Sequence, residues 1–344
     1  MEYILVTGGL GFIGSHTCVE LLNDNYNIIV IDNLSNSSKI VKNQIKKITK
    51  KEIILYTFDL MDIDKLCHIF KKHNIKAVLH FAGLKAVNDS IKKPLLYYKT
   101  NITITLNLLS VMEIYQCNNI IFSSSATVYG NSGLPLTETS KIGEGIINPY
   151  GQTKFIIETI LKDIYQSKNS VSNNIIILRY FNPIGAHSTG LIGENPNDIP
   201  TNLMPYILKV GQQNNDGKYI DERYDFLNIF GGNYETSDGT CVRDYIHVVD
   251  VAQAHVKSLK KMLKNKSYFR IYNLGTGVGH SVLELIETFE NVNNVKIPYK
   301  IVERRKGDRI ELYCNNSLAI KELDWKPLLT LEDMCKDSWK FQKN

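Results

Sequence analysis

The stretch that decides the fold is Thr-Gly-Gly-Leu-Gly-Phe-Ile-Gly at residues 7–14. It follows an apolar, strand-like run at Tyr3–Val6 and precedes a segment with helical spacing. Gly8, Gly11 and Gly14 form a GxxGxxG pattern at this junction. Glycines permit a tight turn and a close backbone approach to a pyrophosphate, which the helix N-terminus attracts. The stretch therefore predicts a dinucleotide-binding turn, although a glycine triplet alone also occurs in plain turns.

Short apolar segments alternate with helical segments outward from this turn. The predicted strands are Tyr3–Val6, Ile28–Ile31, Ile53–Phe58, Ala77–Phe81, Ile120–Phe122 and Ile175–Leu178. The predicted helices are Ser15–Asn23, Asp62–Lys72, Leu95–Tyr115 and Tyr150–Tyr165. Such alternation calls for a parallel sheet covered on both faces. We predict an α/β fold with a Rossmann-type doubly wound parallel sheet in residues 1–181. A smaller C-terminal substrate-binding lobe would occupy 182–344, with residues near 248–261 rejoining the first lobe.

The bulk properties predict a soluble, cytoplasmic protein. The 344 residues are 43% hydrophobic and carry a net charge of +5, with six cysteines far apart and no CxxC pair. We therefore expect the cysteines to be free thiols in a reducing compartment, and we expect no metal site. No apolar run approaches membrane-spanning length, and the first strand leaves no room for a signal peptide. The lysines of 39–51 indicate a solvated helix face, so no nucleic-acid partner is expected. The sequence of the polar insert at 212–225 does not indicate a function for it.

Acidic and apolar residues end the next strands. Asp32 ends the second strand, where a carboxylate can accept hydrogen bonds from both adenosine ribose hydroxyls and would repel a 2′-phosphate. This favours NAD over NADP, and the alternative is a helix cap or loop carboxylate. Asp59 is placed to reach the adenine edge. Phe81, Ala82 and Gly83 would wall the cofactor cleft.

Tyr150 and Lys154 lie four residues apart on a helix that begins near Pro149, so they share a face. The pKa of a free tyrosine is about 10, and a nearby ammonium favours the phenolate, which could serve as a general base. Ser125, at the end of the fifth strand, can hydrogen-bond the same substrate oxygen. A Tyr-x-x-x-Lys pair alone arises by chance. Together with the glycine turn and Asp32, it predicts dehydrogenase-like chemistry.

Segments along nearly the whole chain resemble the UDP-glucose 4-epimerases, a family of extended short-chain dehydrogenases/reductases. They are Thr7–His16, Asp32–Ser37, His80–Val87, Phe122–Gly130, Pro149–Lys154, Arg179–His187, Gly193–Tyr206, Asp238–His247 and Tyr272–Val282. The glycine turn and the tyrosine–lysine pair are common to the superfamily, whereas His80–Val87, Arg179–His187 and the NLMPY sequence are typical of 4-epimerases. The resemblance implies interconversion of UDP-glucose and UDP-galactose in galactose metabolism, through a transient 4-keto intermediate and tightly bound NAD. It also implies a homodimer that pairs the helices at Leu95–Tyr115 and Tyr150–Tyr165.

The resemblance assigns the site residue by residue. Catalysis is assigned to Ser125, Tyr150 and Lys154. The cofactor-binding residues are expected to be Gly8, Gly11, Phe12, Ile13, Gly14, Asp32, Asn33, Asn36, Ser37, Asp59, Leu60, Phe81, Ala82, Gly83, Lys85, Asn101, Ser123, Tyr150, Lys154, Tyr180 and Phe181. The UDP-sugar is expected to contact Lys85, Ser125, Ala126, Thr127, Tyr150, Asn182, Asn202, Leu203, Asn228, Phe230, Arg243, Tyr245, Arg305, Asp308 and Leu312.

Departures from the family pattern leave the substrate range open. Leu312 aligns with the position that controls room for the sugar's 2-substituent, where relatives carry Tyr or a small residue. Thr201 replaces a second asparagine before Asn202. The same chemistry on UDP-N-acetylhexosamines or UDP-pentoses, or a non-catalytic NAD-binding protein, remains an alternative. A 4,6-dehydratase would need Thr-Asp-Glu where this chain has Ser-Ala-Thr at 125–127.

Overall fold

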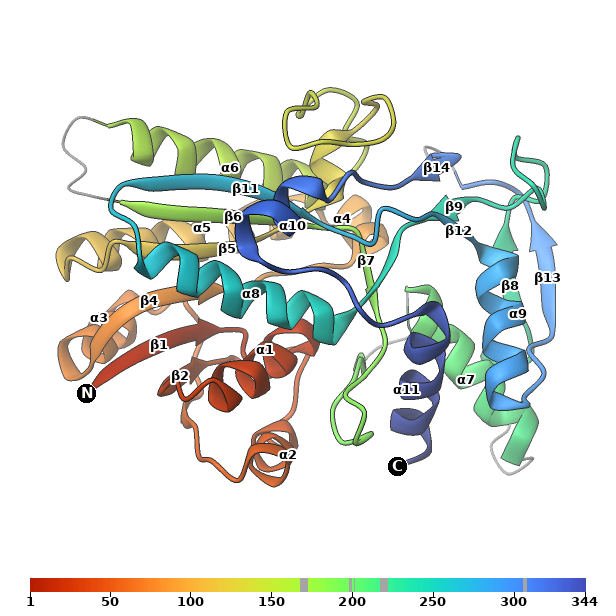
Figure 1. The fold of residues 1–344 in the computed structure, drawn as a ribbon, viewed down its shortest axis with the longest axis horizontal. Coiled ribbons are helices and arrows are strands. Elements are labelled where there is room, and N and C mark those ends of the chain that lie inside the picture. Colours follow the sequence, from red (N-terminus) through yellow and green to blue (C-terminus); the bar gives the residue numbers. More distant parts are fainter. Residues whose placement is uncertain (168–172, 198–199, 201, 217–221, 306–307) are drawn as a thin grey trace.

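A sheet-centred lobe and a smaller lobe at one end of that sheet make up the molecule (Figure 1). The structure is a computed structural model, and it describes residues 1–167, 173–197, 200, 202–216, 222–305 and 308–344. Thr201 and residues 217–221 of the polar insert lie outside the described residues. No helix in the described part of the chain has both the length and the hydropathy needed to cross a membrane.

Seven parallel strands form the main sheet. Their spatial order is β11 (Tyr268–Leu274), β6 (Asn174–Tyr180), β5 (Asn119–Ser125), β4 (Asn74–His80), β1 (Glu2–Thr7), β2 (Ile28–Ile31) and β3 (Ile54–Tyr56). β2 is buried along its whole length, as expected for a parallel strand with helices on both faces. The predicted strands all occur, and β11 is a further strand that the sequence analysis did not predict.

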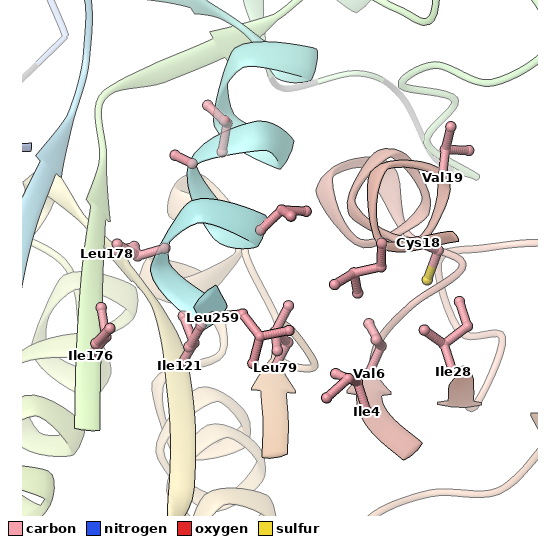
Figure 2. Packing of buried hydrophobic residues seen from close by; sticks show 14 of the residues in the cluster. Ile4, Val6, Cys18, Val19, Ile28, Leu79, Ile121, Ile176, Leu178 and Leu259 are labelled. Carbon is pink, nitrogen blue, oxygen red and sulfur yellow. The ribbon is translucent and has the colours of Figure 1, made fainter. Parts of the chain in front are cut away.

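Helices cover both faces of this sheet. The helices that pack on one face are α1 (Phe12–Asn23), α2 (Ile40–Thr49), α8 (Val248–Leu263) and α10 (Ser317–Leu323). Those on the other face are α3 (Ile63–Lys72), α5 (Pro94–Ile114) and α6 (Pro149–Gln166). Figure 2 shows Cys18 of α1 and Leu259 of α8 over the apolar side chains of the strands. This layering confirms the predicted Rossmann-type doubly wound sheet.

Residues 248–274 return to the first lobe after the chain has entered the second. α8 packs beside α1, and β11 pairs with β6 at the edge of the sheet. Their apolar side chains, among them Leu259 and Leu274, belong to the same core cluster as Val6 and Val30.

The smaller lobe has its own core. Its main elements are α7 (Leu203–Asp216), α9 (Val282–Asn293), α11 (Leu331–Lys343), β8 (Leu227–Phe230) and β13 (Tyr299–Val302). Short ribbons join the lobes: β7 (Asn182–Ile184) with β10 (Tyr245–His247), and β12 (His280–Ser281) with β9 (Val242–Arg243) and β14 (Glu311–Leu312). Brief helical segments complete the chain: α4 (Val87–Lys92), η1 (Ala126–Tyr129) and η2 (Glu222–Tyr224).

Candidate active site

The glycine turn after β1 admits no side chain at two of its glycines. Gly8 has a φ of +69°, and a Cβ there would lie 2.8 Å from the Ala82 backbone nitrogen. A Cβ on Gly14 would lie 2.3 Å from the Gly8 carbonyl oxygen. No side chain among the described residues caps the N-terminus of α1, and its first turn holds no acidic residue. The turn is therefore a backbone cradle whose helix N-terminus favours an anion such as a pyrophosphate.

Asp32 lies beside this cradle, directly after β2. It is 7% exposed, and its carboxylate accepts hydrogen bonds from the backbone N–H of Leu10 (3.0 Å) and Leu34 (2.9 Å) and from Ser37 Oγ (2.7 Å). These bonds orient the carboxylate and leave acceptor capacity, because a carboxylate offers about four lone-pair sites. Asp32 thus organises the loop and keeps about one acceptor site for a ribose hydroxyl.

The neighbouring residues that are expected to hold the adenosine end also interact with one another. Asn33 Nδ2 donates to Asp59 Oδ2 at 2.8 Å, and Asp59 Oδ1 accepts from the Met61 N–H at 2.9 Å. Leu60, between them, is buried. The ends of β2 and β3 therefore form one connected rim.

A segment of the second lobe reaches this rim. Asn197 donates its backbone N–H to Asn36 Oδ1 (3.3 Å) and its side-chain amide to the Ser35 carbonyl (3.1 Å). Glu194 Oε1 accepts from Lys85 Nζ at 2.6 Å and from Asn202 Nδ2 at 2.8 Å. Lys85, expected to contact both cofactor and substrate, is thereby linked to a residue of the sugar-binding set.

Asn101 and Tyr180, both expected near the cofactor, use their polar groups inside the protein. Asn101 Oδ1 accepts from the Leu84 N–H (2.8 Å), and its amide donates to the Leu84 carbonyl (3.0 Å) and to Thr153 Oγ1 (3.1 Å). Tyr180 OH hydrogen-bonds His255 Nε2 at 2.6 Å. Asn101 thus shapes the loop after β4 that carries Gly83, and Tyr180 anchors the end of β6 on α8.

Tyr150 and Lys154 lie in the first turns of α6, whose start is tightly specified. Asn148 caps the helix by accepting from the Gly151 N–H at 2.8 Å, and Pro149 occupies the first turn. A Cβ on Gly151 would lie 3.2 Å from Thr127 Cβ, so the helix packs closely on η1. This contact sets Tyr150 beside the end of β5, where its hydroxyl interacts with that of Ser125.

Lys154 is buried behind Tyr150. Its Nζ donates to the Ser123 carbonyl at 2.6 Å and lies 4.8 Å from the centre of the Phe122 ring and 5.8 Å from that of the Tyr150 ring. Burial lowers the pKa of Lys154 to about 8, and the carboxylate of Glu158 opposes this effect. The ammonium form therefore persists through the neutral range.

Burial raises the pKa of Tyr150 to about 12, although the Ser125 hydroxyl acts in the opposite direction. Lys154 therefore does not by itself bring the tyrosine into the neutral range. Further positive charge beside the phenol would be required for it to act as a base near pH 7. The positively charged nicotinamide of the expected NAD would add to the effect of Lys154.

Several residues expected to hold the UDP-sugar lie on short strands of the smaller lobe or in the segment between β13 and β14. The Arg305 guanidinium stacks 3.7 Å from the centre of the Phe230 ring on β8. Arg243 on β9 places Nη2 at 3.8 Å from Asp308 Oδ1. Two guanidiniums and an aromatic face suit a diphosphate and a base.

Leu312 on β14 is paired in register with Arg243 and packs on the small apolar cluster that contains Ala126 and Phe181. Leu312 thus connects the arginine strand to the residues around Ser125. This location agrees with a role in shaping the space for the sugar. Asn228 lies on β8 two residues before Phe230, and Leu203 is the first residue of α7.

Two expected sugar contacts carry polar atoms without partners. Thr127 Oγ1 and Asn182 Oδ1 are buried and have no hydrogen-bond partner among the described residues. Because buried polar atoms are nearly always paired, these two fit a site that a ligand completes. Tyr245 differs, since it is 3% exposed and packs in the core of the smaller lobe. Within the described ranges, no group of three or more His, Cys, Asp or Glu residues could hold a metal.

Sequence reasoning did not single out Glu158, Arg179 or Glu194, all of which contact or support the expected site residues. Glu158 could have been found, because it lies one helical turn beyond Lys154 on the same face. Arg179 and Glu194 fall within the family-like segments, but their partners are distant in the chain.

Known proteins match almost the whole chain. The model of the NAD dependent epimerase/dehydratase family matches residues 4–275. A UDP-glucose 4-epimerase of Bacillus subtilis (strain 168) is 50% identical over 345 residues, which cover 99% of this chain and 97% of the relative. A Bifidobacterium longum UDP-glucose 4-epimerase, solved with NAD+ and UDP, superposes with a TM-score of 0.92 at 46% identity, covering 99% of this chain and 98% of that one. A Stenotrophomonas maltophila UDP-glucose-4-epimerase with bound NAD and formylated UDP-arabinopyranose gives 0.92 at 44%, with the same coverage.

Proposed function

The chain belongs to the NAD dependent epimerase/dehydratase family, within which it groups with the UDP-glucose 4-epimerases, and from this we propose how it works. It interconverts UDP-glucose and UDP-galactose, in galactose metabolism, by inverting C4 through a transient 4-keto sugar. The observation that carries this conclusion is the meeting of Ser125, Tyr150 and Lys154 at the end of β5, in a chain half identical to such enzymes along its length.

The cradle fits NAD. Gly8 and Gly14 have no room for a Cβ against the neighbouring backbone, which keeps the tight turn that a pyrophosphate-binding helix N-terminus requires. The Asp32 carboxylate accepts three hydrogen bonds within the protein and keeps about one acceptor site for a ribose hydroxyl. We assign the adenosine end to the rim around Asn33, Asn36, Asp59 and Leu60. When bound, NAD supplies the acceptor to which C4 passes its hydride and from which the hydride returns.

Tyr150 removes the proton from the 4-hydroxyl and returns it after the sugar has turned. Ser125 holds the same oxygen, since its hydroxyl interacts with that of Tyr150. Lys154, oriented by the Ser123 carbonyl, supplies the fixed positive charge that this chain contributes toward the phenolate. These groups lie on the ends of β5 and α6, so the reacting oxygen meets a rigid set of partners.

The UDP moiety would be held more firmly than the hexose, which must present both faces of C4. Arg243 and Arg305 are assigned to the diphosphate, Phe230 to stacking, and Asn182 and Asn202 to polar contacts with uracil or sugar. The sequence predicts further contacts from Lys85, Ala126, Thr127, Leu203, Asn228, Tyr245, Asp308 and Leu312.

We propose a cytoplasmic homodimer. The six cysteines are free thiols, which suits a reducing compartment. Helix α5 exposes Leu95, Leu96, Leu106 and Ile114, and exposed apolar side chains of this size favour association. We expect α5 and α6 of two subunits to form a four-helix interface, and light scattering of the purified protein would measure its mass.

UDP-N-acetylhexosamines and UDP-pentoses are the alternative substrates, and the UDP-arabinopyranose derivative bound by the Stenotrophomonas relative favours keeping the pentoses in view. The test is to assay the purified protein on UDP-galactose, UDP-N-acetylgalactosamine and UDP-xylose side by side. We expect UDP-galactose to be converted fastest. No conversion of any of the three would refute the proposed function.

A further inference from the structure

A buried ion pair lies behind the catalytic residues. Glu158, on α6, is 3% exposed, and Arg179, on β6, is 1% exposed. Arg179 binds the carboxylate in a fork, with Nε 3.1 Å from Oε1 and Nη2 2.7 Å from Oε2. Ser124 Oγ adds a third hydrogen bond, 2.5 Å from Oε1. Burying two charges is costly, and apolar residues of similar volume often serve stability as well. Stability alone therefore does not explain why a charged pair occupies this position.

The pair anchors a wider set of residues, which we call the Glu158 network: Ser124, Tyr129, Glu158, Arg179 and Asn273. Arg179 Nη1 donates to Tyr129 OH at 2.9 Å, and Tyr129 OH donates to Asn273 Oδ1 at 2.6 Å. These bonds tie α6 and β6 to η1 and β11. A polar network with its members paired in this way is rigid, and it specifies one arrangement of the elements that it joins.

The network is in register with the catalytic groups. Three consecutive serines at the end of β5 meet three positions of α6. The Ser123 carbonyl holds Lys154, the Ser124 hydroxyl holds Glu158, and the Ser125 hydroxyl interacts with Tyr150. Because Ser124 is covalently joined to both neighbours, any shift at Ser124 moves the carbonyl that orients Lys154 and the hydroxyl that faces the substrate.

The same carboxylate acts on the charge of Lys154. The titratable groups around the Lys154 and Tyr150 side chains are Glu158 on α6, His80 on β4, Tyr97 on α5 and Tyr180 on β6, with Arg179 beyond Glu158. Among these, Glu158 is the carboxylate, and its negative charge favours the ammonium form of Lys154 against burial.

We propose that Glu158 is a positioning residue of the epimerase reaction, which holds the Ser123–Ser125 strand end in register with α6 and keeps Lys154 charged. The inference rests on the proposed function, because it concerns the groups that move the proton of the 4-hydroxyl. The hydrogen bond to Ser124 supplies the first effect and the carboxylate charge the second. Separate substitutions can therefore tell the two apart.

The experiment compares Ser124→Ala, Glu158→Gln and Glu158→Asp with wild type, measuring kcat and KM for UDP-galactose across pH, and the NAD content of each folded protein. Ser124→Ala should lower kcat about tenfold with KM little changed and with unshifted pH limbs. Glu158→Gln should lower kcat about tenfold to hundredfold and move the alkaline limb about one pH unit lower, because Lys154 then loses its proton more easily. Glu158→Asp keeps the negative charge on a shorter side chain. Compared with Glu158→Gln, it should therefore return the alkaline limb closer to its wild-type position than it returns kcat to the wild-type value.

Glu322→Gln is the matched control, because Glu322, like Glu158, accepts hydrogen bonds from an arginine and from a hydroxyl group, here those of Arg270 and Tyr272 on β11. It should leave kcat and the pH limbs as in wild type. Unchanged kcat and pH limbs in folded Ser124→Ala and Glu158→Gln would overturn the inference. Should Glu158→Gln fail to fold, an unchanged kcat in Ser124→Ala would overturn it alone. Inactivity of wild type would instead refute the proposed function.

Discussion

The glycine turn and the UDP-sugar end are built in contrasting ways. The turn is made of backbone between β1 and α1, locked into a seven-stranded sheet, and leaves no space for a Cβ at Gly8 or Gly14. The UDP-sugar end is made of side chains on strands of two to four residues and on the segment between β13 and β14. There Arg305 is exposed, and Arg243 lies 3.8 Å from Asp308, a loose ion pair.

The contrast matches what the reaction demands. A redox-neutral cycle needs a retained cofactor and fixed proton-transfer groups, so those sites benefit from a rigid backbone. The hexose must turn over between two half-reactions, so its surroundings have to tolerate two orientations. Long arginine side chains can keep hold of a diphosphate throughout this change. Substitutions in the two regions should therefore fail in different ways.

Tyr150→Phe should have the largest effect, because it removes the proton-transfer group from the rigid region and leaves the UDP-sugar end untouched. We expect kcat for UDP-galactose to fall by about two to four powers of ten. The Kd for UDP, measured by calorimetry, should stay within about twofold of wild type, since the hydroxyl is no part of the diphosphate site. Turnover within a few-fold of wild type would show that another group is the base.

Gly14→Ala tests the rigidity of the cradle itself. The added methyl would meet the Gly8 carbonyl oxygen at 2.3 Å, so the turn must distort. We expect the protein to lose about 1–3 kcal/mol of unfolding free energy and most of its copurifying NAD. Gly133→Ala is the control, because a Cβ at Gly133 meets nothing within 4 Å in the described part of the chain. Equal NAD content in both variants would contradict a backbone cradle.

Arg243→Gln should separate the second region from the first. Losing a charged hydrogen-bond donor to a diphosphate costs about 1.5–3 kcal/mol, or roughly tenfold to a hundredfold in KM. We expect kcat to change much less, because the interaction is present throughout the reaction, and the NAD content to stay at the wild-type level. A fall in kcat at constant KM would mean that Arg243 acts on the reacting centre instead.

Substitutions of Leu312 should have the smallest effect, a change in the relative activity on two sugars. It lies opposite Arg243 in the β9–β14 pairing and packs with Ala126, so its size limits the space near the sugar. We expect weak activity of wild type on UDP-N-acetylgalactosamine, more in Leu312→Cys and none in Leu312→Tyr. In wild type the barriers for the two sugars should differ by only about 1–3 kcal/mol, as is usual for a poor fit in a pocket. Equal efficiencies for both sugars in all three proteins would show that Leu312 does not limit the pocket.

The rigid region was also the more predictable one. Gly8, Gly14 and Asp32 lie at the ends of strands or the start of a helix, and the strand and helix periodicity located them in advance, although Asp32 also bonds Leu10 and Gly8 lies against Ala82. α1 nevertheless begins at Phe12, earlier than expected, because the Ser15 N–H donates to the Gly11 carbonyl and so extends the helix into the glycine turn.

The second region depended on the family resemblance. The placement of Leu312 opposite Arg243 arises from the pairing of two short strands that are distant in sequence, and no periodicity marks strands of two residues. The Glu158–Arg179 pair was missed for the same reason, since its partners lie on different elements. The strand β11 escaped notice because Arg270 and Asn273 interrupt its apolar pattern.

The most direct test of the account is to run the reaction in D2O without added NAD and to follow C4 by NMR. If hydride leaves C4 for a retained cofactor and returns to the same carbon, purified protein will convert UDP-galactose to UDP-glucose, and the product will carry protium at C4. Deuterium at C4 would mean that the hydrogen exchanges with solvent as a proton. That result, or conversion only when NAD is supplied, would contradict the account.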